Sequence, residues 1–293
     1  QLLVDVWQVS AAGVAGTGHI DEPDPEGVVP LMLCAANMDD PNFGFDAYNP
    51  DNGIDQGDIL VIKAPSHDWS GSPGNFLALD FDGNGAKDLA KFLAGDCMRE
   101  DGAGGWVDHC TYRHDEEVYT ETGNMPNKVA WGINTRFNEY SGDLNKKKPT
   151  DGPDEENTAA PYHPDCKQST NSALSVNEDS FAQGGNIPYT YTKLDDGLVG
   201  ELQTYHEYDL GEETAPLSDT DPDFCVDNKR IIWVPTADCT GLSPGKSPAD
   251  IELACMYLPQ KVTKEKGAGN SHYILAEMLD SQYCPIRPGV APV

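Results

Sequence analysis

An acidic loop near residue 80 has the residue types and spacing of a calcium-binding loop. In DFDGNGAKD, residues 80–88, oxygen-bearing side chains stand at positions one, three, five and nine, with glycine at position six. This is most of an EF-hand pattern, but Lys91 occupies position twelve, where a bidentate glutamate closes such a loop. The sequence therefore allows a calcium site completed from elsewhere in the fold, or a turn that caps the next helix, which the missing ligand favours. The candidate ligands are Asp80, Asp82, Asn84 and Asp88.

A second group of carboxylates could also hold a divalent cation. Asp219, Asp221 and Asp223 alternate in the sequence DTDPD, and a cation would relieve the repulsion between them. The chain has 49 acidic and only 19 basic residues, so acidic clusters are also expected from composition alone. Calcium is therefore the one candidate cofactor, and composition does not separate a cation site from an adaptation to salty surroundings.

The cysteines indicate disulfides rather than a metal site. They are even in number and scattered singly, without a C-x-x-C pair, which is typical of a protein from an oxidising compartment. Free buried thiols are the alternative. We expect Cys97 to pair with Cys110, because little chain separates them, and Cys166 to fasten the polar segment around it. The eight cysteines are Cys34, Cys97, Cys110, Cys166, Cys225, Cys239, Cys255 and Cys284.

Catalytic and nucleotide-binding motifs are absent from the sequence. It contains no G-x-S-x-G, no H-E-x-x-H and no phosphate-binding loop. His109, Cys110 and His114 form the one tight group of metal-ligand types, and a disulfide cysteine between surface histidines explains it better than zinc. We therefore predict that the chain is not an enzyme, with a hydrolase that uses paired carboxylates as the least favoured hypothesis.

The charge and hydropathy of the chain exclude two classes of partner. A net charge of −30 repels phosphate backbones, so we expect no nucleic-acid binding. No run of 18 apolar residues occurs, so we expect no helix of this chain to insert into a membrane.

The elements that must position these residues are mostly strands. Helices are expected near 86–95, where Gly95 provides a stop, and near 127–140, where apolar residues share one stripe. The fold class is therefore α+β and β-rich, with sandwich-like sheets stapled by disulfides. Strand-like apolar runs occur at 28–34, 59–63, 76–80, 189–193, 198–204, 230–235, 251–258 and 273–278.

A polar segment interrupts the apolar periodicity at about 143–185. We interpret it as a surface insertion in a single domain that covers residues 1–293. Two lobes, at 1–142 and 186–293, are the alternative.

The N-terminal segment is apolar on both faces of a predicted strand. It is either an ordinary strand of the fold or a strand that adds to the sheet of a neighbouring subunit. Repeated head-to-tail addition does not close and would build a filament. The residues proposed for self-assembly are Leu2, Leu3, Val4, Val6, Trp7 and Val9.

Several spaced segments together resemble the TadE/TadG-like Flp pilus-assembly proteins. The most specific match lies within residues 73–97, where PGNFLAL precedes a glycine-rich turn and the helix-like AKDLAKFLAG. TETGN at 120–124, NTRF at 134–137, VPLMLC at 29–34, RIIWVPTADC at 230–239 and ILAE at 274–277 resemble further parts of the family pattern. The resemblance runs from about residue 6 to 284 and skips the insertion, which favours one domain. The family has an N-terminal hydrophobic helix that this sequence lacks, so either it was cleaved or the chain is a released relative.

This resemblance implies a bacterial, exported protein at the cell surface or outside the cell, without catalytic activity. We therefore predict a structural protein that is pilus-associated or itself forms filaments. Its partners would be further copies of the chain or other pilus and envelope proteins. The alternative is a calcium-dependent cell-surface binding module or adhesin.

Overall fold

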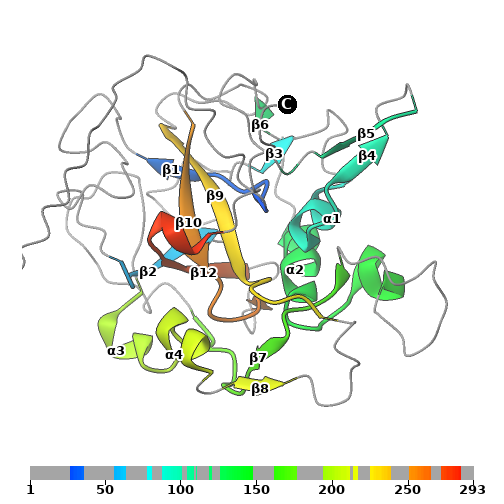
Figure 1. Ribbon diagram of the computed structural model, residues 1–293. Coiled ribbons are helices and arrows are strands. Elements are labelled where there is room, and N and C mark those ends of the chain that lie inside the picture. Colours follow the sequence, from blue (N-terminus) through cyan, green and yellow to red (C-terminus); the bar gives the residue numbers. More distant parts are fainter. Residues whose placement is uncertain are drawn as a thin grey trace, which may run out of the picture.

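A mixed β-sheet forms the centre of the protein in a computed structural model (Figure 1). The structure describes residues 27–35, 56–63, 78–80, 88–100, 104–108, 110, 119–120, 126–147, 162–176, 194–211, 214–216, 225–238, 251–264 and 272–284. The N-terminal segment proposed for self-assembly and the predicted strand at 189–193 lie outside these residues.

The central sheet has β9 and β10 in its middle. Its strands are β1 (Leu33–Ala35), β9 (Ile231–Asp238), β10 (Glu252–Tyr257), β12 (His272–Met278), β2 (Ile59–Lys63) and β11 (Thr263–Lys264). They follow the order β1, β9, β10, β12, and both β2 and β11 pair with β12. β1 runs parallel to β9, whereas the other pairs are antiparallel.

Alternation along the strands gives the sheet two apolar faces. Ile232 and Val234 of β9 pack into the cluster that contains the helical residues Leu93 and Ile133. The intervening Ile231 and Trp233 point to the opposite face, because successive side chains of a strand alternate. The sheet is therefore buried on both sides, which accounts for the nearly continuous apolar sequence of β9.

Two helices cover the first face. They are α1 (Leu89–Ala94) and α2 (Pro126–Thr135), which lie side by side (Figure 1). Gly95 ends α1 with φ 99°, a left-handed conformation that favours glycine, as the sequence predicted. The stripe expected over 127–140 continues beyond the end of α2, since Phe137 and Tyr140 still pack against buried residues.

The close approach of α1 to α2 depends on Gly132. A Cβ atom at this position would lie 2.5 Å from the Ala90 carbonyl oxygen and 2.5 Å from the Leu93 Cβ. We expect Gly132→Ala to lower the free energy of unfolding by about 1–3 kcal/mol, because the helices must move apart. Urea unfolding followed by circular dichroism measures the change. Gly200→Ala is the matched control, since a Cβ there meets nothing within 4 Å; a similar loss in both variants would contradict the packing argument.

Two short helices, α3 (Asp196–Val199) and α4 (Tyr205–Leu210), lie on the other face. The strand predicted at 198–204 is therefore wrong. Its apolar residues Leu198, Val199 and Leu202 instead pack from a helix and a turn against the sheet. A capping box starts α4: the Thr204 hydroxyl accepts the Glu207 N–H, and the Glu207 carboxylate accepts the Thr204 N–H.

The remaining described elements surround this core. Three two-stranded sheets pair β3 (Leu79–Asp80) with β6 (Tyr119–Thr120), β4 (Met98–Glu100) with β5 (Trp106–Asp108), and β7 (Lys167–Ser169) with β8 (Thr214–Pro216). Short 3-10 helices cover Gly142–Lys147 and Ser281–Tyr283. The α+β, β-rich class is confirmed, although the principal sheet is covered by helices on both faces. Among the described helices, none has the length and hydropathy needed to cross a membrane.

Three disulfides staple the described part of the chain. Cys97 joins Cys110, as predicted from their spacing. Cys166 joins Cys225 across 59 residues, and Cys255 of β10 joins Cys284 across 29 residues. Cys34 lies in β1, and Cys239 lies outside the described residues.

The polar segment at 143–185 is not confined to the surface. Tyr162, Asp165 and Val176 are buried, and Asp165 forms an isolated bridge with Val226 beside the Cys166–Cys225 disulfide. Residues 162–176 therefore contribute to the interior. Their polar composition did not predict this role, because the buried side chains form a hydrogen-bonded network rather than an apolar stripe.

Candidate functional site

A buried carboxylate organises the polar interior beside α4. Asp165 is fully buried and accepts the backbone N–H of Lys167 at 2.8 Å and that of Arg230 at 3.0 Å. The Tyr208 hydroxyl donates to the same carboxylate at 3.0 Å. Burial raises the pKa of Asp165, while the nearby charge of Arg230 and these hydrogen bonds act in the opposite direction.

The guanidinium of Arg230 is also fully buried and lies among aromatic rings. Its carbon Cζ lies 4.6 Å from the ring centre of Tyr208, 4.9 Å from that of Tyr257 and 5.3 Å from that of Phe137. Nη2 donates to the Gln203 side-chain oxygen at 2.8 Å and to the Lys167 carbonyl at 3.1 Å. Nε and Nη1 have no hydrogen-bond partner among the described residues, where the ring faces supply the remaining electrostatic contact of this cation.

A second buried arginine joins the helices α1 and α2 to the start of β9. Arg136, just after α2, donates from Nε to the Leu93 carbonyl at 2.9 Å and from Nη1 to the Lys229 carbonyl. Burial lowers its pKa to about 10, and Asp165 partly offsets this effect. These contacts tie α1 and α2 to the start of β9, so the cluster is structural in character.

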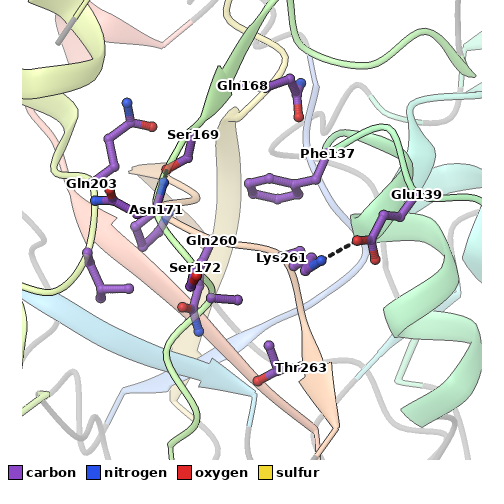
Figure 2. Close-up of a pocket in the computed structure, with 13 residues that line it drawn as sticks. Phe137, Glu139, Gln168, Ser169, Asn171, Ser172, Gln203, Gln260, Lys261 and Thr263 are labelled. Carbon is purple, nitrogen blue, oxygen red and sulfur yellow. Dashed lines mark hydrogen bonds and ion pairs between the residues drawn. The ribbon is translucent and has the colours of Figure 1, made fainter. Parts of the chain in front are cut away.

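A pocket of about 480 Å³ lies next to this cluster (Figure 2). Two residues connect the pocket to the cluster: Gln203 accepts from Arg230, and Phe137 packs against the Arg230 guanidinium. Figure 2 shows the Phe137 ring pointing into the space between the surrounding side chains. The lining comprises Phe137, Glu139, Gln168, Ser169, Asn171, Ser172, Ala173, Leu202, Gln203, Pro259, Gln260, Lys261 and Thr263.

The described lining of the pocket has no net charge. It contains one acid, Glu139, and one base, Lys261, and these two side chains form an ion pair with each other. The rest of the lining is mainly amides and hydroxyls. The described lining therefore holds one carboxylate, whereas most glycoside hydrolases use a pair.

A buried glutamate of the central sheet holds the start of α4. Glu277 of β12 is buried and accepts the Tyr205 N–H at 2.6 Å, at the start of α4. Burial raises the pKa of Glu277 to about 7, with a further contribution from the negative charge of Glu207. This carboxylate therefore titrates near neutral pH, although it lies outside the pocket lining.

The predicted calcium ligands are only partly described. Asp80 ends β3, and Asp88 lies directly before α1, where its carboxylate forms an ion pair with Lys91. Asp88 therefore stands where a helix-capping residue would, but its side chain forms no capping hydrogen bond with the first turn of α1. Asp82 and Asn84 lie outside the described residues, as do Asp219, Asp221 and Asp223.

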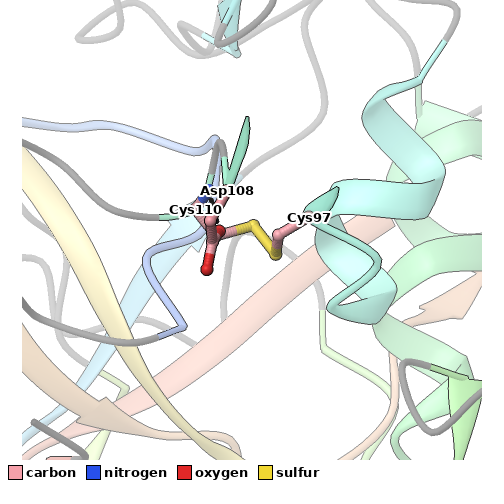
Figure 3. Close-up of side chains that lie close together, drawn as sticks. All are labelled: Cys97, Asp108 and Cys110. Carbon is pink, nitrogen blue, oxygen red and sulfur yellow. Dashed lines mark hydrogen bonds between the residues drawn. A yellow bond between two sulfur atoms is a disulfide. The ribbon is translucent and has the colours of Figure 1, made fainter. Parts of the chain in front are cut away.

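One group of metal-ligand types comes together in the described residues, and the disulfide accounts for it. Cys97, Asp108 and Cys110 lie within 4.8 Å of one another (Figure 3). The two sulfurs are bonded to each other, and the Asp108 carboxylate accepts the Cys110 N–H at 2.9 Å. Disulfide sulfurs are not thiolates and do not bind zinc, so the group is a structural staple.

The pocket and the buried cluster were not predicted from the sequence. The lining residues are spread from 137 to 263, and Asp165 and Arg230 are 65 residues apart, so no local spacing marks them. The helix α4 did carry a local signal, because Thr204 and Glu207 have the spacing of a capping box.

Comparison of the chain with protein-family models, with curated proteins and with solved structures gave no match. The resemblance to TadE/TadG-like proteins therefore remains a prediction from the sequence segments quoted above.

Proposed function

We propose that this chain is a non-catalytic, exported bacterial protein of the cell surface, which is pilus-associated or itself forms filaments. The observation that carries the proposal is the set of three disulfides, which join three separate parts of the described fold. Disulfides persist in oxidising environments and are rare in reducing ones, so they support an extracellular location. The resemblance to TadE/TadG-like proteins supplies the association with pili.

The character of the buried ionisable groups supports a structural rather than a catalytic role. Three buried charged residues form hydrogen bonds with backbone groups: Asp165, Arg136 and Arg230. The bonds of Arg136 to Leu93 and of Arg230 to Lys167 hold together segments that are far apart in the sequence. These three charged groups are engaged within the fold, and none of them is among the described residues that line the pocket. A protein that resists load and proteolysis outside a cell benefits from this arrangement and from the covalent staples.

Self-assembly is tested by size-exclusion chromatography and negative-stain electron microscopy of the purified, oxidised chain, with calcium and with a chelator. A variant without residues 2–9 is the matched comparison. We expect filaments or ordered oligomers of the full chain and monomers of the truncated one, because the apolar segment would provide the junction. A monomeric full chain in both conditions would overturn the filament-forming role and leave an accessory role at the pilus.

A further inference from the structure

We propose that the pocket beside Phe137 binds a neutral carbohydrate. This inference does not depend on the proposed structural function, because it concerns a different part of the chain from the segment proposed for assembly. The chain has a net charge of −30, yet the described lining of the pocket contains one acid and one base, Glu139 and Lys261, which neutralise each other.

The chemistry of the lining matches the surface of a sugar. Gln168, Asn171, Gln203 and Gln260 carry amides, and Ser169, Ser172 and Thr263 carry hydroxyls. Amides and hydroxyls both donate and accept hydrogen bonds, as sugar hydroxyls do. The Phe137 ring offers an apolar face against which the C–H groups of a pyranose can pack (Figure 2).

Three of the amides are fixed from the protein side. The Gln203 side-chain oxygen accepts from Arg230 at 2.8 Å and from the Tyr257 hydroxyl at 3.1 Å. Gln260 accepts the Leu174 N–H at 2.6 Å and donates to the Leu174 carbonyl at 3.1 Å. Gln168 donates to the carbonyls of Arg136 and Asp165. Most of the hydrogen-bonding capacity of these three amides is therefore used within the protein. They form a wall that is held in place before a ligand arrives, which lowers the entropic cost of binding, while the hydroxyls of Ser169 and Ser172 would bond the sugar.

The pocket is accessible and of suitable size. Glu139 and Ser172 are exposed, so one side of the pocket opens to solvent. A volume of about 480 Å³ lies within the range of small-molecule sites. A charged ligand would find no uncompensated charge among the described lining residues, which favours neutral hexoses and N-acetylhexosamines over sulfated or sialylated sugars.

The experiment uses an array of immobilised neutral oligosaccharides, with sialylated and sulfated oligosaccharides as anionic comparators, followed by titration calorimetry with the best-retained neutral one. We expect selective retention of neutral sugars with a Kd on the order of 1 mM, or about −4 kcal/mol. No retention of any neutral sugar, or stronger retention of the anionic ones, would overturn the proposal.

Variants then locate the binding. Phe137→Leu keeps an apolar side chain but removes the ring, and we expect it to weaken binding about tenfold. Ser172→Trp places a large ring at the exposed rim and should abolish detectable binding even if Phe137→Leu proves unstable. Thr170→Ala is the matched control, because Thr170 is exposed between two lining residues but does not line the pocket. Thermal unfolding verifies that each variant is folded. Unchanged binding in both pocket variants would place the sugar elsewhere and contradict the assignment.

Discussion

Asp165→Ala is expected to lower the free energy of unfolding by about 3–5 kcal/mol, the cost of removing one partner from a buried charged cluster. The substitution leaves the N–H groups of Lys167 and Arg230 and the hydroxyl of Tyr208 without their shared acceptor. It also leaves the buried guanidinium of Arg230 without its nearby negative charge. Urea unfolding monitored by tryptophan fluorescence measures the loss.

Two further variants separate this effect from a general sensitivity to mutation. Tyr208→Phe removes a single donor to Asp165 and should cost about 1 kcal/mol. Asp227→Ala changes an exposed aspartate in the turn before β9 and should alter stability by less than about 0.5 kcal/mol. A loss below about 1 kcal/mol for Asp165→Ala would show that the carboxylate does not organise this part of the fold.

Glu277→Gln is expected to stabilise the protein at pH 8 by up to about 3 kcal/mol and to have little effect near pH 4.5. The folded protein raises the pKa of Glu277 from 4.5 to about 7, so the folded state binds this proton more tightly than the unfolded state. The contribution to stability is therefore fully present below pH 4.5 and is lost as the pH rises through 7. Glutamine is neutral at every pH, and its side-chain oxygen can still accept the Tyr205 N–H.

The measurement is a comparison of urea unfolding at pH 4.5, 6 and 8. Glu201→Gln is the matched control, because it removes one negative charge from the same chain at an exposed position. We expect the stability difference between Glu277→Gln and the control to grow with pH. A constant difference across the three pH values would contradict the raised pKa of Glu277.

The predicted elements are correct where the local sequence pattern agrees with the burial of the segment in the fold. β2 has the predicted bounds, β9, β10 and β12 lie within two or three residues of theirs, and Gly95 ends α1 as expected. These segments are apolar on both faces or end at a residue with a special conformation, and both features are local. The strand predicted at 198–204 is wrong because apolar composition alone does not separate a short helix from a strand.

The buried cluster could not be predicted in this way, since its partners meet only through the fold. The polar composition of residues 162–176 indicated the surface, yet Asp165 is among the most buried residues. A buried polar group is stabilised by partners whose sequence positions carry no periodicity. The pocket could not be predicted for the same reason. Segments from either side of the sheet meet there, and the sequence of each segment alone is typical of a polar loop.

We propose that this protein works outside the cell with its cysteines paired. The most direct test of this location is to shear surface material from producing cells and to label thiols in the sheared and intracellular fractions under denaturing conditions. We expect the chain in the sheared fraction, with at least the six cysteines of the three described disulfides protected until a reductant is added. A chain that stays inside the cell with these thiols open to labelling would contradict both the location and the proposed function.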